Sequence, residues 1–119
     1  MKGVVKMDLN DYQSRCHEYD VYEPTRNPKD PAFMDKILGL VGESGEVADK
    51  IKKNLRDKDG DLRTFDYFEV ALELGDVLWY LAELAHYLGF GLEDIATMNI
   101  HKLEDRQARD AIQGSGDHR

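Results

Sequence analysis

The sequence predicts an all-α protein with about four helices joined by short turns. Apolar residues recur at three- and four-residue intervals over long segments, which is the spacing of an amphipathic helix. No stretch of useful length shows the strict alternation of apolar and polar residues that is typical of a β-strand. The chain has 119 residues, a length that suits one domain over residues 1–119.

The first two expected helices flank a proline-rich segment. The first covers about residues 7–19, with Asp8 as its N-cap. All three prolines fall within residues 21–31, which must form a loop because each proline lacks a backbone donor. Pro31 suits the first turn of the second helix, and the apolar spacing continues from there to a glycine-bearing turn at residues 57–61.

Three glycines fall inside this second helix at three-residue intervals, namely Gly39, Gly42 and Gly45. Each costs about 1 kcal/mol relative to alanine in a helix interior. Their spacing therefore predicts a neighbour that approaches the helix too closely to tolerate side chains.

The third and fourth expected helices are separated by glycines. The third covers residues 62–88 and has one broad apolar stripe. Gly89 and Gly91 end it, and the fourth helix covers about residues 92–108. The polar, glycine-bearing tail at residues 114–119 does not continue the fourth helix.

The charge and cysteine content exclude several classes of protein. The net charge is -8, which argues against a general nucleic-acid binder, because such a protein needs a basic face. The single cysteine, Cys16, allows no intramolecular disulfide and favours a reducing, cytoplasmic location. We find no apolar run long enough for a membrane span and therefore expect no membrane partner.

Two pairs of acidic residues are the candidates for a metal site. Glu43 and Glu46 lie three residues apart in the second helix, and Glu73 and Asp76 have the same spacing in the third. On a helix this spacing places both side chains on neighbouring positions of one face. The second pair lies among large apolar residues, where an acid is costly unless it is compensated. Mg²⁺, or Mn²⁺, is the simplest compensation, because hard cations prefer oxygen ligands.

Other polar and aromatic residues are candidates for binding a phosphate-bearing substrate. Cations near the acidic pairs could neutralise phosphates, although solubility or local ion pairing would also explain them. An aromatic residue could stack on a base, although aromatics at helical spacing are more often core residues. The candidates are Lys50, Lys53, Arg56, Trp79, Asn99, Lys102 and Arg106.

These motifs resemble those of the MazG-like all-α nucleoside triphosphate pyrophosphohydrolases. Gly42-Glu43-Ser44-Gly45-Glu46 followed by Glu73-Leu74-Gly75-Asp76 is similar to the family's Glu-Glu-x-x-Glu and Glu-x-x-Asp pattern. The similarity continues into the segment from Asn99 to Arg106, so that it covers roughly residues 33–106. One position departs from the pattern, because Gly42 stands where the family often has its leading Glu.

The resemblance implies Mg²⁺-dependent hydrolysis of (deoxy)nucleoside triphosphates to a nucleoside monophosphate and pyrophosphate, in nucleotide-pool house-cleaning. By position, Glu43, Glu46, Glu73 and Asp76 take the metal-ligand and catalytic roles. The resemblance also implies a MazG-like four-helix bundle that oligomerisation completes, as a homodimer or homotetramer. A 119-residue chain with one largely apolar helix is poorly placed to cover that helix alone.

Two other classes remain open. A carboxylate-bridged di-iron bundle needs two Glu-x-x-His motifs, and the chain offers only Glu83-Leu84-Ala85-His86. A non-catalytic helical interaction module would explain the helices, but it would not explain why the acids Glu73 and Asp76 lie among apolar residues.

Overall fold

Four α-helices and one short 3₁₀ turn make up the protein, as the computed structural model of the chain shows for residues 6–109. The helices are α1 (Leu9–His17), α2 (Pro31–Lys58), α3 (Tyr67–Tyr87) and α4 (Leu92–Ala108), and the 3₁₀ turn is Leu62–Thr64. No β-strand occurs in this described part, so the all-α prediction is confirmed. The tail at residues 114–119 lies outside it.

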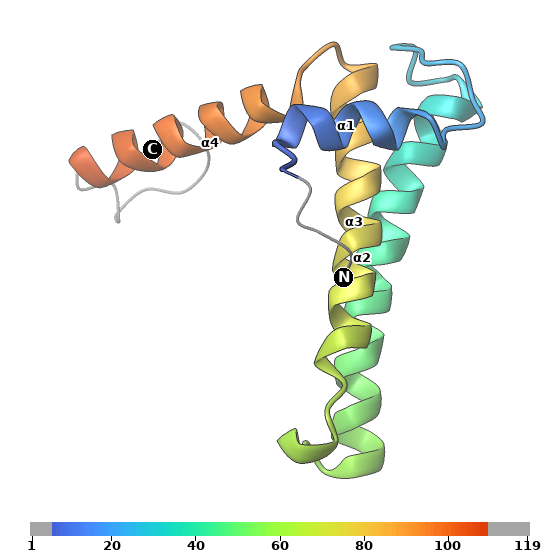
Figure 1. Cartoon of the computed structure of the whole chain (residues 1–119), viewed down its shortest axis with the longest axis vertical. Helices are drawn as coiled ribbons and strands as arrows, with labels where there is room; N and C mark the ends of the chain where they lie inside the picture. Colours follow the sequence, from blue (N-terminus) through green and yellow to red (C-terminus); the bar gives the residue numbers. More distant parts are fainter. Residues whose placement is uncertain (1–5, 110–119) are drawn as a thin grey trace.

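The two longest helices, α2 and α3, lie side by side and antiparallel (Figure 1). α1 crosses them near the start of α2 and the end of α3, and α4 projects away from the pair (Figure 1). Within the chain α4 packs against α1 and α3. The described chain is therefore a helical hairpin with two shorter helices at one end, and it is not by itself a closed four-helix bundle.

The predicted start signals of the first two helices are confirmed. The Asp8 side chain accepts from the Asp11 N–H, and the Asp11 side chain accepts from the Asp8 N–H, which together form a capping box. Pro31 occupies the first turn of α2, and Asp30 caps that helix by accepting from the Ala32 N–H.

One predicted boundary was wrong, since the third helix does not begin at residue 62. Leu62–Thr64 forms a 3₁₀ turn instead, which Asp61 caps through the Arg63 N–H. The chain then extends, and α3 begins at Tyr67 after Asp66, whose side chain accepts from the Glu69 N–H. The side chains of Asp61 and Asp66 bind backbone N–H groups that would otherwise continue a helix. The apolar spacing carries no information about these bonds, so it did not reveal the break between the two elements.

A small core lies where α1 crosses α3 near the start of α4. Cys16, Ala82 and Leu92 are buried there, and side chains from the same elements pack around them, namely Tyr12, Leu78, Trp79 and Leu81. Gln13 holds the three helices together. Its Nε2 donates to the carbonyl oxygens of Ala82 and Phe90 at 3.1 and 2.9 Å, and its Oε1 accepts from the Leu92 N–H at 3.0 Å.

Candidate active site

Three carboxylates converge in the gap between α2 and α3. Glu43 comes from α2, while Glu73 and Asp76 lie one turn apart on α3. One carboxylate oxygen of each residue lies within 4.8 Å of one carboxylate oxygen of each of the other two. Because the two helices are antiparallel neighbours, the chain brings together acids that are some 30 positions apart in the sequence.

The cluster has the electrostatics of a cation site. Partial burial raises the pKa of Glu43, and the negative charges of Asp76, Glu73 and Glu46 raise it further. All the donors are oxygens, and Glu43 and Glu73 are half-buried while Asp76 is exposed. These donors fit a hard divalent cation such as Mg²⁺ or Mn²⁺, which also keeps coordination positions for water and phosphate.

Two expectations about the acids need adjustment. Asp76 is exposed in the protomer, so its apolar sequence neighbours do not bury it. Glu46 is also exposed and does not meet the 4.8 Å distance to the other three, although its charge acts on Glu43. The structure thus groups three of the four predicted ligands.

The three predicted cations of α2 are engaged in exposed ion pairs. Lys50 lies 3.8 Å from Glu69, Lys53 lies 2.9 Å from Asp49, and the Arg56 guanidinium contacts Asp57. Such pairs contribute at most about 1 kcal/mol and exchange readily.

Lys50 and Lys53 line a cavity of about 200 Å³ that α2 forms with the start of α3. Lys50 follows Glu43 by seven residues, which is about 10 Å along the helix axis. Along α2 the cavity therefore begins about two helical turns from the carboxylate cluster, in the direction of the 3₁₀ turn.

The predicted residues of α4 do not join the cluster within one protomer. Asn99, Lys102 and Arg106 lie on the helix that projects away from the α2–α3 pair (Figure 1). Asn99 lines an apolar groove between α1, α3 and α4, with Leu9, Leu81 and Ile95 among its other walls. A role for these residues in substrate binding stays a prediction that requires a second subunit.

Trp79 has a structural role in the protomer. Its indole N–H donates to the Cys16 carbonyl oxygen at 3.1 Å, and its ring packs against the core. Tyr80 meets it edge-on, with the ring centroids 4.9 Å apart. These contacts explain Trp79 without a ligand, so stacking on a base also stays a prediction.

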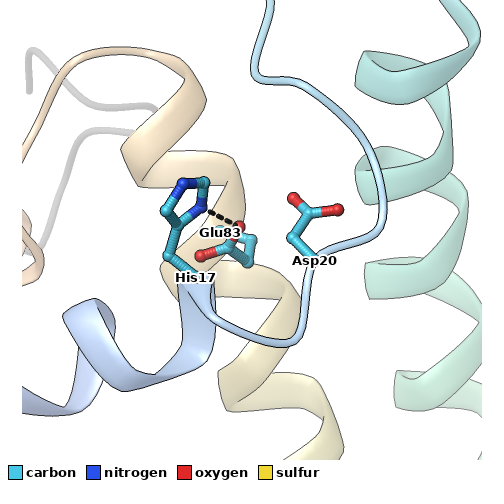
Figure 2. A group of neighbouring side chains, drawn as sticks. All are labelled: His17, Asp20 and Glu83. Atoms are coloured by element: carbon cyan, nitrogen blue, oxygen red, sulfur yellow. Dashed lines mark hydrogen bonds and ion pairs between the residues drawn. The ribbon is translucent and has the colours of Figure 1, made fainter.

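A second polar cluster, which was not among the predicted sites, is formed by His17, Asp20 and Glu83 (Figure 2). Nδ1 of His17 lies 3.2 Å from Oε2 of Glu83, and the Asp20 carboxylate lies on the other side of Glu83 (Figure 2). Burial raises the pKa of Glu83 to about 7, and the neighbouring Asp20 contributes to this shift.

A buried lysine lies beside this second cluster. The Lys36 ammonium lies 3.1 Å from Asp20 and 2.8 Å from Asp35, above the rings of Tyr22, Trp79 and Tyr87. Burial alone would lower the pKa of Lys36, but the two carboxylates raise it above its ordinary value. Burial alone would raise the pKa of Asp20, but hydrogen bonds involving Glu83, Tyr87, Tyr22 and Lys36 lower it to about 2.

The sequence does contain a signal for this cluster. Glu83 interrupts the apolar run Leu81-Ala82-Glu83-Leu84-Ala85, as Lys36 interrupts the apolar face of α2. A charged residue in such a place predicts a buried partner. The partners, however, come from α1 and the following loop, so only the folded chain identifies them.

Comparison with known proteins agrees with this fold. The family profile described as the MazG nucleotide pyrophosphohydrolase domain matches residues 34–109. The Gene 37 protein of Mycobacterium phage L5 is 50% identical over 82 residues, which cover 69% of this chain and 72% of the phage protein. No solved structure shows a significant match.

The fold and the site together place the protein in a class: all-α proteins in which carboxylates from two antiparallel helices form a site suited to a hard cation. The match over most of the chain then identifies the family, and the protein belongs to the MazG nucleotide pyrophosphohydrolases. Among residues 6–109, no helix combines the length and the hydropathy that crossing a membrane requires.

Proposed function

We propose that the protein hydrolyses (deoxy)nucleoside triphosphates to a nucleoside monophosphate and pyrophosphate, in a Mg²⁺-dependent reaction that clears the cytoplasmic nucleotide pool. The observation that supports this most directly is the meeting of Glu43, Glu73 and Asp76 between α2 and α3. Family membership supports the reaction class. Mn²⁺ is the expected substitute for Mg²⁺, since it accepts the same oxygen donors.

In the proposed reaction, water attacks the α-phosphorus and the bond to the bridging oxygen of the β-phosphate breaks. Glu43, Glu73 and Asp76 would hold the cation, with Glu46 at the exposed edge. When bound, the cation neutralises phosphate charge and makes the attacking water more acidic. A carboxylate of the cluster accepts the proton of that water, and pyrophosphate leaves with the bridging oxygen.

The substrate phosphates would extend from the carboxylates toward the cavity lined by Lys50 and Lys53. The ion pairs of these lysines are exposed, so that a phosphate can replace Glu69 or Asp49 at little cost. Arg56 lies one turn further along α2 and would act at longer range.

A panel of triphosphates assayed for pyrophosphate release, with and without Mg²⁺, tests the proposal. We expect pyrophosphate and monophosphate in equal amounts from at least one substrate, and none in EDTA. Glu73→Gln should lower turnover at least about 100-fold, because it weakens charge stabilisation in the transition state. The exposed acid Glu104 offers a matched control, as Glu104→Gln should leave turnover unchanged. Release of orthophosphate alone would show that a different bond is cleaved.

We also propose that the active form is a homodimer or homotetramer. Large apolar side chains on α2 and α3 are each more than half exposed in the protomer, namely Leu38, Val41, Leu55, Phe68, Leu72 and Leu74. Gly42, Gly45 and Gly75 lie in open space, so they leave room for a close helix neighbour. A second copy that covers these faces would complete a bundle and could bring its α4 residues to the site.

Sedimentation velocity tests the assembly. Val41→Asp places a charge in the exposed apolar stripe of α2 and should shift the native oligomer toward monomer. Tyr19→Asp is the matched control, because Tyr19 is just as exposed but follows α1. A native protein that sediments as a monomer at assay concentrations would contradict the proposal.

A further inference from the structure

Oε1 of Glu83 is a buried acceptor that no hydrogen-bond donor meets in the described part of the chain. The side chain is 0% exposed, so water cannot supply a donor from bulk solvent. Leaving such an oxygen without a partner costs about 1–3 kcal/mol, and more if the group is charged. Native proteins rarely keep this arrangement without a bound ion, water or proton that explains it.

Three elements bring nitrogen and oxygen donors to this point. His17 is the last residue of α1, Asp20 lies in the loop that follows, and Glu83 lies in α3 (Figure 2). One donor atom from each lies within 4.8 Å of the others. Two ligands that each lie about 2.0–2.1 Å from a tetrahedral ion are roughly 3.4 Å apart. Nδ1 of His17 and Oε2 of Glu83 are 3.2 Å apart, close to that separation.

From this geometry we propose that His17, Asp20 and Glu83 form a second cation site, which binds a divalent transition-metal ion such as Zn²⁺. The imidazole nitrogen distinguishes it from the all-oxygen cluster, because imidazole favours Zn²⁺, Co²⁺ and similar ions over Mg²⁺. Glu83 follows Asp76 by seven residues, which is about 10 Å along α3. The ion is therefore separate from the one that the first cluster would hold.

Neighbouring side chains and a backbone N–H hold the proposed ligands in place, as hydrogen-bond partners of metal ligands commonly do. Asp20 accepts from the Tyr87 hydroxyl at 2.6 Å, from the Tyr22 N–H at 3.0 Å and from Lys36 at 3.1 Å. The rings of His17 and His86 pack with their centroids 4.3 Å apart, which fixes the imidazole of His17. The His17 side chain is 41% exposed, so an ion can enter from solvent at this residue.

Within residues 6–109, the negative charge of Glu83 is not balanced by a permanent positive charge. Lys36 balances the charge of Asp20 within the buried pair, while the ion-pair partner of Glu83 is the imidazole of His17. A divalent ion held by both carboxylate oxygens would neutralise Glu83 and would also give Oε1 a partner. The rival explanation is a proton shared between Glu83 and Asp20, which would satisfy the same oxygen without a metal.

Co²⁺ absorption on the full-length protein distinguishes the two explanations. The titration is done in excess Mg²⁺, which occupies the all-oxygen cluster. Four- or five-coordinate Co²⁺ with an imidazole ligand absorbs visible light far more strongly than Co²⁺ in an all-oxygen, octahedral site. We expect a band that saturates at one equivalent per chain and disappears when Zn²⁺ is added.

Single substitutions assign the band to its ligands. His17→Ala and Glu83→Gln should each weaken Co²⁺ binding at least about 10-fold, since even outer partners of metal ligands have effects of this size. His101→Ala removes a histidine of α4, and Glu73→Gln removes an acid of the first cluster. Both control variants should keep the band and the native affinity.

Several results would overturn the proposal. These are the absence of a band at millimolar Co²⁺, a band that survives His17→Ala, and a band lost in His101→Ala or Glu73→Gln. Circular dichroism checks the fold of each variant. If Glu83→Gln does not fold, His17→Ala decides the question alone, because the half-exposed His17 can be truncated without opening the core.

Discussion

The Lys36 ammonium lies 3.1 Å from Oδ1 of Asp20, and both side chains are only 1% exposed. This buried pair joins the start of α2 to the loop that follows α1, while Tyr87 connects the same aspartate to α3. One charge pair therefore connects three separate elements. The attraction within such a buried pair adds little net stability, because both charges lose their hydration, but removing one partner leaves an uncompensated buried charge and destabilises the fold strongly.

Lys36→Met should therefore destabilise the protein by about 3–5 kcal/mol, because it leaves the buried Asp20 carboxylate without its cation. Urea unfolding followed by circular dichroism measures the loss. Lys52→Met is the control, since Lys52 forms an exposed pair with Asp49 and should change stability by at most about 0.5 kcal/mol. The double variant Lys36→Met/Asp20→Asn should recover part of the loss. If Lys36→Met lowers the free energy of unfolding by less than Lys52→Met does, the Lys36–Asp20 pair is not needed for stability.

The close approach predicted from three glycines occurs at one of them. A Cβ on Gly39 would overlap the ring of Tyr80, whereas one on Gly42 or Gly45 would meet nothing within 4 Å. Gly39→Ala should therefore cost about 1–3 kcal/mol by overpacking the α2–α3 contact. In the Val41→Asp background, where no second copy is expected to cover α2, Gly45→Ala should be neutral or should stabilise the helix by up to about 1 kcal/mol. Urea unfolding under matched conditions checks both, and equal effects would contradict the assigned contact.

Much of the fold could be predicted from local signals. Asp8 and Pro31 set the starts of α1 and α2, Gly89 follows the end of α3 with a positive φ, and Gly91 is the N-cap of α4. Each of these signals acts within a few residues. The fourth helix was expected at residues 92–108, where α4 lies. At residues 61–66 two closely spaced aspartate caps interrupt a helical apolar pattern, and periodicity alone does not detect such a break.

The candidate site was predictable only where its residues follow from helical spacing. Glu73 and Asp76 lie one turn apart whatever the tertiary structure, and pairing α2 with α3 brings Glu43 to them. Burial was less predictable. The acid that the fold buries completely is Glu83, because α1 crosses α3 at that level. The sequence gives the same kind of apolar neighbours to Asp76, which stays exposed.

The burial of Glu83 predicts a specific dependence of stability on pH in the metal-free protein. Its pKa rises from an ordinary value of 4.5 in the unfolded chain to about 7 in the folded one, through burial first and Asp20 second. Between these two values the folded state holds a proton that the unfolded state has released. The contribution of Glu83 to stability therefore falls as pH rises from about 4.5 to 7, and it is constant outside that window.

Glu83→Gln tests this in EDTA, because glutamine cannot release the proton. The variant should resemble the native protein near pH 5 and should become more stable than the native protein by pH 8. Groups that face Glu83, namely His17, Asp20, Lys36, His86 and Tyr87, are retained in both proteins, so the difference in melting temperature isolates residue 83. Glu104→Gln is an exposed control. A difference that does not change between pH 5 and 8 would refute the assignment.

Mg²⁺ should stabilise the folded protein by binding the carboxylates of the first cluster, Glu43, Glu73 and Asp76. An ion that binds only the folded state stabilises it by mass action, by about 2.7 kcal/mol at a concentration 100 times its dissociation constant. Each kcal/mol raises the melting temperature of a chain of this size by roughly 3–5 °C. Mg²⁺ should therefore raise the melting temperature of the native protein by several degrees. Glu73→Gln and Asp76→Asn should each reduce this rise, because each removes one of the three converging carboxylates.

The same melting curves separate a metal site from a merely acidic surface. If the acids only repel one another, neutralising one should stabilise the protein without Mg²⁺ and leave the Mg²⁺-dependent rise unchanged. If they hold the ion, the rise shrinks while the helical signal stays native. Glu46→Gln should have a smaller effect than Glu73→Gln, because Glu46 lies outside the 4.8 Å group. Equal rises in the native protein and all three variants would remove these residues from the site, and with them the support that the cluster gives to the proposed hydrolysis.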